Sequence, residues 1–327
     1  MIVVSYFRWP NHGGPFPPCH PGDCSNRLGF LRKEQRQVHK LIIGCGYLGH
    51  RVARQWQQAG DHVSVLTRSV SRAGQLAEEG LHPLVGDLTA VDSLPEFPAC
   101  DTVLYAVGYD RSSGASIQQV YVEGLKHALE ALPSSTGRII YISSTGVYGQ
   151  DDGNWVDESS PCHPTRPGGI ACLAAEKLLA SHPRGVGSIV LRLAGIYGPD
   201  RLPRRAAIEA GESLATPADG YLNLIHVEDG VQAILAAESS ETLPPLLVVT
   251  DGQPVLRGTY FEEMARLLDA PAPLFKPPDP TSPVAQRATG NKRISNQRLL
   301  KELGLSLKYP SFREGLGSLL APPGTPC

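Results

Sequence analysis

The sequence predicts an α/β protein built on a doubly wound parallel sheet, with a smaller mixed lobe after it. Short apolar runs alternate with stretches of helical spacing from residue 38 to 194, which is typical of a parallel sheet covered by helices. A glycine-rich turn joins the first apolar run to the first helical stretch. Prolines gather at 199–217 and 271–283, where this alternation has ended.

The composition excludes several classes of protein. The 327 residues include 30 Lys or Arg and 32 Asp or Glu, so the net charge of −2 lacks the positive surplus of nucleic-acid or membrane-surface proteins. No apolar run reaches the roughly 18 residues that span a membrane. The 7 cysteines are an odd number without a repeated spacing, which is typical of reduced thiols. We therefore expect a cytoplasmic protein with neither nucleic-acid nor membrane partners.

Residues 1–37 are expected to be a disordered extension, or a stretch upstream of the true start. Prolines crowd this segment, which lacks the apolar content needed to offset its chain entropy. Cys19 and Cys24 lack the second matching pair that zinc sites show, and no cluster with metal-ligand spacing follows residue 38. We therefore expect no metal, and residues 321–327 are expected to be a tail.

The first lobe, residues 38–194, contains six expected strands. Each is a short apolar run, as expected for strands buried on both faces of a parallel sheet. Gly60 and Gly80 lie where a left-handed residue ends a helix, and Pro133 stops a longer helix. The expected strands are 38–43, 63–66, 84–85, 102–107, 138–143 and 188–193, and the expected helices are 48–56, 70–79, 115–132 and 169–181.

The second lobe, residues 195–320, has shorter elements between its prolines. We expect the elements of residues 228–250 to pack on the sheet of the first lobe. The expected elements are a strand at 246–250 and helices at 228–238, 258–269 and 295–303.

The turn after the first strand fits the pattern G-x-G-x-x-G. At this position Gly44 allows a tight turn, Gly46 lets the backbone approach a diphosphate, and Gly49 lets the helix pack closely on the strand. The N-terminus of the helix favours the phosphate charge. The sequence therefore predicts a Rossmann-type dinucleotide site. The residues expected to bind the cofactor here are Gly44, Gly46, Tyr47, Leu48 and Gly49.

The end of the second strand favours NADP over NAD. An NAD site usually carries an acid about 20 residues after the glycine turn, where it binds the ribose 2′-hydroxyl. Here the strand ends with Thr67, and Arg68 and Ser69 follow. A guanidinium pairs well with a phosphate, and a hydroxyl can add a hydrogen bond. NAD is the less favoured cofactor. The alternative is that Arg68 only faces solvent at the end of the strand and binds no phosphate.

Two further strand ends complete the expected cofactor site. A Gly-Asp-Leu segment follows the third strand, where its carboxylate could approach the adenine amino group. Small residues end the fourth strand, where the backbone could pass beneath the cofactor. The residues concerned are Asp87, Leu88, Ala106, Val107 and Gly108.

These motifs together resemble the extended and atypical short-chain dehydrogenase/reductase superfamily, the NAD-dependent epimerase/dehydratase group. The resemblance covers about residues 38–320 and implies a lobe that binds NAD(P) and a second lobe that closes over a substrate, often a nucleotide sugar. Its markers, besides the glycine turn, are Gly86–Leu88, Ser143–Gly149, Leu191–Pro199 and Ile225–Asp229, and Lys292–Asn296, Glu302–Gly304 and Tyr309–Ser311 resemble an atypical branch.

The resemblance implies that Ser144 hydrogen-bonds the reacting oxygen, with Ser143 and Thr145 beside it in the substrate site. A serine turn that merely leaves a strand is the alternative.

The family's Tyr-x-x-x-Lys pair is missing from this chain. In relatives the tyrosine transfers a proton, and the lysine lowers its pKa and binds the nicotinamide ribose. Counting back from Glu176 places Gly168 at the tyrosine position and Cys172 at the lysine position. No lysine in the sequence follows a tyrosine by four residues.

Four residues are candidates near the reaction centre. Tyr148 and Tyr197 could replace the missing tyrosine, or pack beneath the nicotinamide. Cys172 could act as a thiol acid/base, although a helical cysteine is more often a small core residue. His226 could orient the substrate, or form a structural hydrogen bond.

Two classes of function follow. The first is an NADP-dependent oxidoreductase or epimerase acting on a small carbonyl or nucleotide-sugar substrate, in which the cofactor carries the hydride. The second is a non-catalytic NADP-binding protein, either a redox sensor or a scaffold; a nucleotide-sugar binding module is a further alternative. By analogy with relatives, helices 115–132 and 169–181 would form a homodimer.

Overall fold

The core of the fold is a seven-stranded sheet, which the sequence predicts in class and in direction. The computed structural model describes residues 37–282, 285 and 290–320, and those from Gln37 onward belong to one compact unit. All six strand pairings are parallel, in the order β12-β7-β5-β4-β1-β2-β3. The strands are β1 (His39–Ile43), β2 (His62–Thr67), β3 (His82–Val85), β4 (Thr102–Tyr105), β5 (Arg138–Ser144), β7 (Ile189–Leu193) and β12 (Leu246–Val249). The doubly wound α/β prediction is confirmed.

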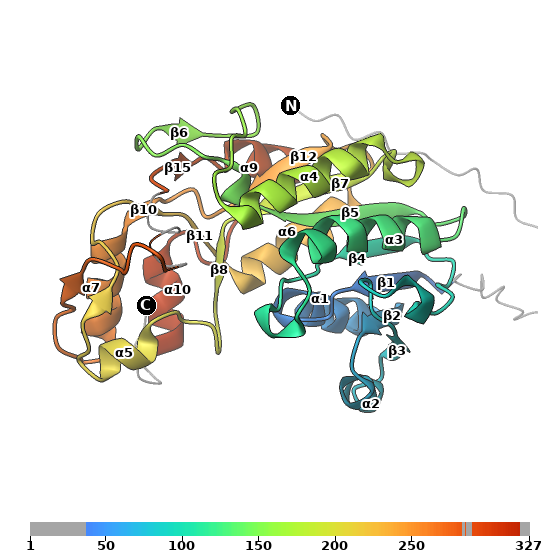
Figure 1. Ribbon diagram of the computed structural model, residues 1–327, viewed down its shortest axis with the longest axis horizontal. Helices are drawn as coiled ribbons and strands as arrows, with labels where there is room; N and C mark the ends of the chain where they lie inside the picture. Colours follow the sequence, from blue (N-terminus) through green and yellow to red (C-terminus); the bar gives the residue numbers. More distant parts are fainter. Residues whose placement is uncertain (1–36, 283–284, 286–289, 321–327) are drawn as a thin grey trace, which may run out of the picture. The chain divides into compact units, whose positions relative to one another are not determined.

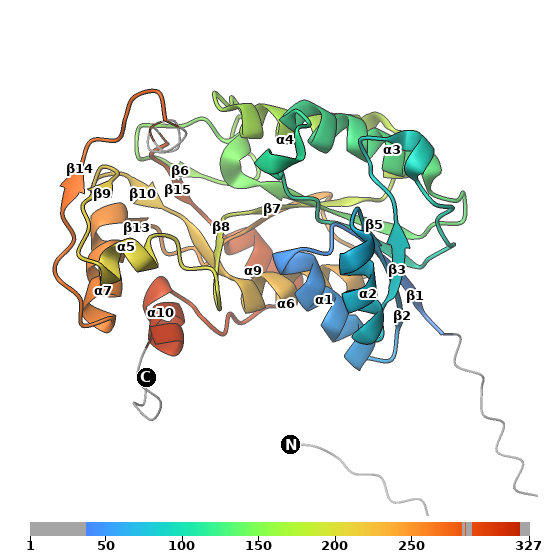
Figure 2. The ribbon, with the colours of Figure 1, turned by 60° about the horizontal axis from the view of Figure 1, so that its bottom comes forward.

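Helices cover both faces of this sheet, and alternate side chains of each strand enter two different cores. In β1, Leu41 and Ile43 pack with α3 and α4, whereas Ile42 packs with α1 and α6. This alternation follows from the two-residue period of a strand. The two helical layers lie on opposite sides of the sheet in Figure 1 and Figure 2. The helices are α1 (Tyr47–Gln58), α2 (Val70–Glu78), α3 (Gly124–Ala131), α4 (Pro167–Ser181) and α6 (Val227–Ser239).

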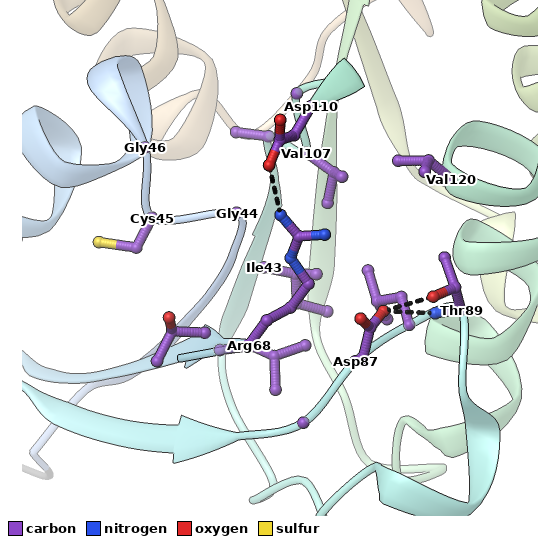
Figure 3. Close-up of a pocket in the computed structure, with 16 residues that line it drawn as sticks. Ile43, Gly44, Cys45, Gly46, Arg68, Asp87, Thr89, Val107, Asp110 and Val120 are labelled. Carbon is purple, nitrogen blue, oxygen red and sulfur yellow. Dashed lines mark hydrogen bonds and ion pairs between the residues drawn. The ribbon is translucent and has the colours of Figure 1, made fainter. Parts of the chain in front are cut away.

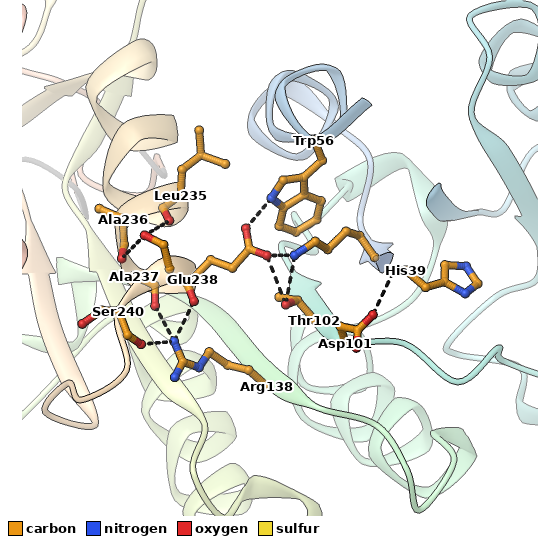
Figure 4. A network of polar contacts seen from close by, with 12 residues as sticks. His39, Trp56, Asp101, Thr102, Arg138, Leu235, Ala236, Ala237, Glu238 and Ser240 are labelled. Carbon is orange, nitrogen blue, oxygen red and sulfur yellow. Dashed lines mark hydrogen bonds and ion pairs between the residues drawn. The ribbon is translucent and has the colours of Figure 1, made fainter. Parts of the chain in front are cut away.

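A buried ion pair ties two helices to the amino ends of the strands (Figure 4). Lys40 of β1 pairs with Glu238 of α6. The same carboxylate accepts hydrogen bonds from Trp56 Nε1 at 2.6 Å and Thr102 Oγ1 at 3.2 Å. Arg138 donates to three carbonyl oxygens at the end of α6. Buried charges need such partners, and this network supplies them at the amino ends of β1 and β4, opposite the glycine turn.

A third hydrophobic core holds the later elements together. It is built mainly from α7, α10 and the strands near them, and the short strands pair as β8–β11, β9–β14 and β6–β15 in parallel and β10–β13 antiparallel. The helices of this part are α5 (Arg205–Glu209), α7 (Arg257–Leu267) and α10 (Phe312–Leu320), whereas α9 (Gln297–Leu303) packs through Leu299 in the core of α1 and α6. The strands are β6 (Trp155–Val156), β8 (Gly195–Tyr197), β9 (Leu214–Ala215), β10 (Tyr221–Leu222), β11 (Leu224–His226), β13 (Val255–Leu256), β14 (Phe275–Lys276) and β15 (Arg293–Ile294).

Several elements differ from the sequence-based expectation. The helix expected at 115–132 starts at Ile117 and contains a π-helical segment at Gln119–Glu123, and α10 was not expected. The extension expected at 1–37, apart from Gln37, and the tail expected at 321–327 lie outside the described residues. Among the described helices, none combines the length and the apolar character needed to cross a membrane.

Candidate functional site

The glycine turn after β1 packs directly against the end of β4. Gly44 has a φ of +98°, and a Cβ added there would lie 2.6 Å from the carbonyl oxygen of Ala106. A Cβ on Gly49 would lie 2.4 Å from the carbonyl oxygen of Gly44. Gly46 is different, because a Cβ there would meet no atom within 4 Å. The first and third glycines thus allow close packing, and the second leaves open space at the start of α1.

A cavity of about 290 Å³ opens beside this turn (Figure 3). It lies at the carboxyl ends of β1, β2, β3 and β4, where ligands bind in open α/β sheets. Eight of the expected cofactor residues line it: Gly44, Gly46, Arg68, Asp87, Leu88, Ala106, Val107 and Gly108. The sequence motifs therefore meet in one place.

Arg68 reaches across the cavity to a carboxylate. Its Nη2 lies 3.1 Å from Asp110 Oδ2, and both side chains are about half exposed. Figure 3 shows this pair between the glycine turn and Asp87. The pKa of Asp110 is lowered mainly by hydrogen bonds from Ser112, with a smaller contribution from Arg68. The ends of β2 and β4 thus present a cation and an anion to the cavity.

Ser69 and Asp87 both serve their own backbone turns. The Ser69 hydroxyl accepts a hydrogen bond from Arg72 N at 3.2 Å and so caps α2. Asp87 Oδ1 accepts hydrogen bonds from Thr89 N at 2.8 Å and Thr89 Oγ1 at 2.7 Å. Ser69 does not line the cavity, whereas Asp87 does.

Tyr47 and Leu48 lie just outside the cavity lining. Leu48 is buried in the core beneath α1. The Tyr47 hydroxyl donates to the carbonyl oxygen of Pro199 at 2.8 Å, and its ring lies 4.0 Å from the Arg51 guanidinium and 5.1 Å from that of Arg201. Tyr47 therefore connects the glycine turn to the segment after β8.

Ser144 ends β5, the neighbour of β4, at the same edge of the sheet as the cavity. Its Oγ accepts a hydrogen bond from Gly146 N at 3.0 Å, and the side chain is only partly buried. A hydroxyl that accepts in this way still has its own proton to donate. Ser143 and Thr145 are buried, and the Ser143 hydroxyl donates to Glu176 Oε1 at 2.5 Å.

Tyr148 is buried with its hydroxyl held by an arginine. Its exposure is 1%, and its oxygen accepts a hydrogen bond from Arg192 Nη1 at 2.9 Å. Arg192 also pairs with Glu176, at 3.0 Å from Nε and 2.6 Å from Nη2. Burial raises the pKa of Tyr148 to about 12, although the Arg192 charge opposes this shift. The geometry is that of a structural network.

Tyr197 and His226 lie together in the interior. Each is 1% exposed, and their rings meet edge to face with centroids 5.3 Å apart. His226 Nδ1 accepts a hydrogen bond from Glu228 N at 3.3 Å and so caps α6, and burial lowers the pKa of His226. Tyr197 Oη and His226 Nε2 have no hydrogen-bond partner among the described residues.

The two positions that correspond to the missing pair lie on α4. A Cβ added at Gly168 would meet only Ile117 Cδ1, at 3.6 Å, so the place of the tyrosine side chain is open at its base. Cys172 is buried, and burial raises the pKa of its thiol to about 12. A thiol in this state stays protonated at neutral pH and is a poor base.

Sequence reasoning missed two cations near Ser144. Arg166 is the N-cap residue of α4. Lys292 is buried, and its Nζ donates to the carbonyl oxygen of Tyr148 at 2.8 Å. Lys292 lies in a marker segment, but a single lysine in a connecting segment shows no periodicity that would reveal its neighbours.

The glycine turn, the cavity and the parallel sheet together define an NAD(P)-binding protein of the Rossmann type. The family model described as "NAD dependent epimerase/dehydratase family" matches residues 41–245, which is more than half of the chain. The chain belongs to this family.

Three proteins illustrate what this chain is similar to. Protein YeeZ of Escherichia coli K12 is 29% identical over 278 residues, which cover 82% of this chain and 95% of that protein. The 3-diazoavenalumate denitrifying reductase of a Streptomyces species is 28% identical over 307 residues, covering 85% and 98%. A solved structure from Methylobacillus flagellatus, assigned to the NAD-dependent epimerases/dehydratases, is 33% identical with a TM-score of 0.68, covering 86% and 97%.

Proposed function

We propose that this protein is an NADP-dependent oxidoreductase or epimerase-like enzyme acting on a small carbonyl or nucleotide-sugar substrate, and that it works without a Tyr-x-x-x-Lys pair. The observation that carries this is the cavity at the glycine turn, with Arg68 on one side and the hydroxyl of Ser144 at the end of the adjoining strand. Similarity to a reductase and to an assigned epimerase/dehydratase supports the reaction class.

NADP rather than NAD is supported by the residues that follow β2. No acid stands at the end of this strand, and Arg68 lines the cavity. A 2′-phosphate would compete with Asp110 for the guanidinium. An exposed ion pair is worth only about 0–1 kcal/mol, so this exchange of partners costs little. NAD remains the alternative, because the family as a whole is described as NAD dependent.

The chain's own residues would divide the work at the reaction centre. The cofactor supplies or accepts the hydride when bound. The Ser144 hydroxyl would donate a hydrogen bond to the reacting oxygen of the substrate and keep its own proton, while Gly146 N fixes the orientation of Oγ. Preorganised donors of this kind stabilise negative charge that develops on oxygen.

The other predicted site residues would support this centre from behind. Ser143, Tyr148 and Arg192 form one buried network with Glu176, which holds the end of β5 against α4. Thr145 begins the turn after Ser144. Tyr197 and His226 are 1% exposed, so we assign them to the packing between β8 and β11 beneath the substrate rather than to proton transfer.

A non-catalytic NADP sensor or scaffold is the second candidate function. It is favoured by Gly168 and Cys172, which replace the proton-transferring pair, and by the burial of Tyr148. We also propose a cytoplasmic location, which four free cysteines in the described part of the chain support. A homodimer through α3 and α4 stays a prediction.

The two functions are separated by one experiment. Binding of NADPH is followed by its fluorescence, and oxidation of NADPH is then measured with a panel of aldehydes, ketones and nucleotide sugars. The enzyme predicts turnover that falls at least about 100-fold in Ser144→Ala, with NADPH binding unchanged. Binding without oxidation across the panel would favour the sensor.

A further inference from the structure

We propose that Arg166 and Lys292 form an anion-binding subsite beside Ser144, which takes a carboxylate or phosphate group that the substrate carries close to its reacting carbon. This inference rests on the proposed function, because it places the anion next to the hydroxyl that would bind the reacting oxygen. It assigns a role to two cations that the nucleotide cavity does not use.

The turn after Ser144 brings the three groups together. A Cβ added at Gly146 would lie 3.2 Å from Ser144 Oγ and 3.4 Å from Arg166 Nη2, so the hydroxyl and the guanidinium flank the same point. Lys292 Nζ lies at the other end of this turn, 2.8 Å from the carbonyl oxygen of Tyr148. Ser144, Gly146 and Arg166 are each partly exposed, so solvent reaches this turn.

Both cations are held by backbone that cannot easily move away. Arg166 precedes α4, whose first turn packs on Gly146, since a Cβ at Gly169 would lie 2.2 Å from the Gly146 carbonyl oxygen. Lys292 precedes β15, and its carbonyl oxygen accepts a hydrogen bond from Asn223 Nδ2 at 2.9 Å. The proposed subsite therefore lies between the start of α4 and the segment that precedes β15.

The electrostatics favour an anion at this place. Burial, and to a smaller extent the charge of Arg166, lowers the pKa of Lys292 to about 8. Within the described residues, Lys292 forms no ion pair with a carboxylate. A buried ammonium without a counter-ion is unfavourable, and a second cation beside it adds repulsion. A bound anion would offset both the burial of the unpaired ammonium and the repulsion between the two cations. The N-terminus of α4 would add a small attraction for the anion.

The open base at Gly168 leaves room beside the first turn of α4. Gly168 lies two residues after Arg166, and a Cβ added there would meet only Ile117 Cδ1, at 3.6 Å. A substrate group larger than a hydrogen atom can therefore approach the first turn of α4.

The test is an ion titration by calorimetry on the full chain saturated with NADP⁺, so that the glycine turn is occupied. Oxalate and inorganic phosphate are the probes, and the one that binds more tightly identifies the carboxylate or the phosphate source. We expect binding with one ion per chain, weakened at least tenfold in Arg166→Gln and in Lys292→Gln. Lys292→Arg keeps the charge and should stay within about threefold of wild type. Lys177→Gln, an exposed lysine on α4, is the matched control and should bind as wild type does.

Three results overturn the subsite. They are NADP⁺ binding without binding of either probe ion, ion binding that Arg166→Gln leaves unchanged, and an equal loss in Lys177→Gln. If Lys292→Gln does not fold, Arg166→Gln and Lys292→Arg decide the question. A chain that binds no dinucleotide but loses ion binding in Arg166→Gln would refute the proposed function and keep the subsite, so the two failures are distinguishable.

Discussion

Arg192 on β7 joins Glu176 on α4 through two hydrogen bonds and donates a third to the hydroxyl of Tyr148. Glu176 lies eight residues after Gly168, so this ion pair anchors the helix that carries the family's proton-transferring pair in relatives. The scaffold for that chemistry is intact here, while its reactive side chains are replaced. We therefore propose that Ser144, rather than a side chain of α4, contacts the reacting oxygen.

Breaking the Arg192–Glu176 pair should destabilise the fold strongly. Both side chains are at most 10% exposed, so Arg192→Met would leave a buried carboxylate without its partner. We expect the free energy of unfolding in urea to fall by about 3–5 kcal/mol. Arg205→Met is the control, because its pair with Glu209 is exposed and should contribute less than about 1 kcal/mol. Equal losses in the two variants would contradict the structural role.

Gly46→Ala should weaken dinucleotide binding while leaving stability nearly unchanged. A Cβ at Gly46 meets no protein atom within 4 Å, so it would project into the space that we assign to the diphosphate. We expect at least a tenfold loss of NADPH affinity by fluorescence titration and a change below about 1 kcal/mol in urea unfolding. Gly74→Ala in α2, which also has open space, should keep full affinity. Unaltered NADPH binding by Gly46→Ala would contradict our assignment of the diphosphate to the space beside Gly46.

Arg68→Ala should reduce affinity for NADPH and spare that for NADH. The guanidinium would contact only the 2′-phosphate, and loss of a charge-assisted pair of this kind weakens binding by about tenfold. Asp110→Asn should raise the affinity for NADPH, because it removes the carboxylate that pairs with Arg68. Affinities for both dinucleotides are measured side by side, with Arg54→Ala as an exposed control. An equal loss for both cofactors would remove the argument for NADP.

Asp251→Asn should stabilise the fold at high pH only. Burial raises the pKa of Asp251 to about 7, its Oδ1 accepts a hydrogen bond from Gln253 N, and its Oδ2 has no partner among the described residues. The folded carboxyl therefore holds its proton more tightly than the unfolded one. Its contribution to stability is present below about pH 4 and is lost as the pH rises toward 7.

An amide does not titrate, so the variant should gain about 4 kcal/mol in the free energy of unfolding at pH 8 and less than about 1 kcal/mol at pH 4. Urea unfolding across this range measures the difference. Asp92→Asn, at an exposed position, should show no such dependence. A gain that is the same at both pH values would contradict a raised pKa at Asp251.

The sequence predicts the main sheet well and the later elements poorly, for a physical reason. Strands such as β1 are buried on both faces, so each is an apolar run that can be recognised alone. Strands β6 and β8 to β11 have only two or three residues, and such lengths show no periodicity. Helix α10 was missed, although its apolar face packs in the third core.

The candidate site divides in the same way. The glycine turn could be predicted because its residues are close together in the sequence and the backbone conformation or packing at each position favours glycine. The cationic subsite could not, since Arg166 and Lys292 are far apart in the chain and meet only through the pairing of β6 with β15 and the packing of α4 on Gly146. The roles of Ser143 and Tyr148 depend on Glu176 and Arg192, whose proximity is likewise tertiary.

The most direct measurement is a titration of the purified full chain with NADPH and with NADH, followed by the fluorescence of the reduced nicotinamide. The account predicts saturable binding of one dinucleotide per chain, with NADPH bound at least about tenfold more tightly and with that preference lost in Arg68→Ala. Failure of both dinucleotides to bind at millimolar concentration would contradict the assignment of the glycine turn.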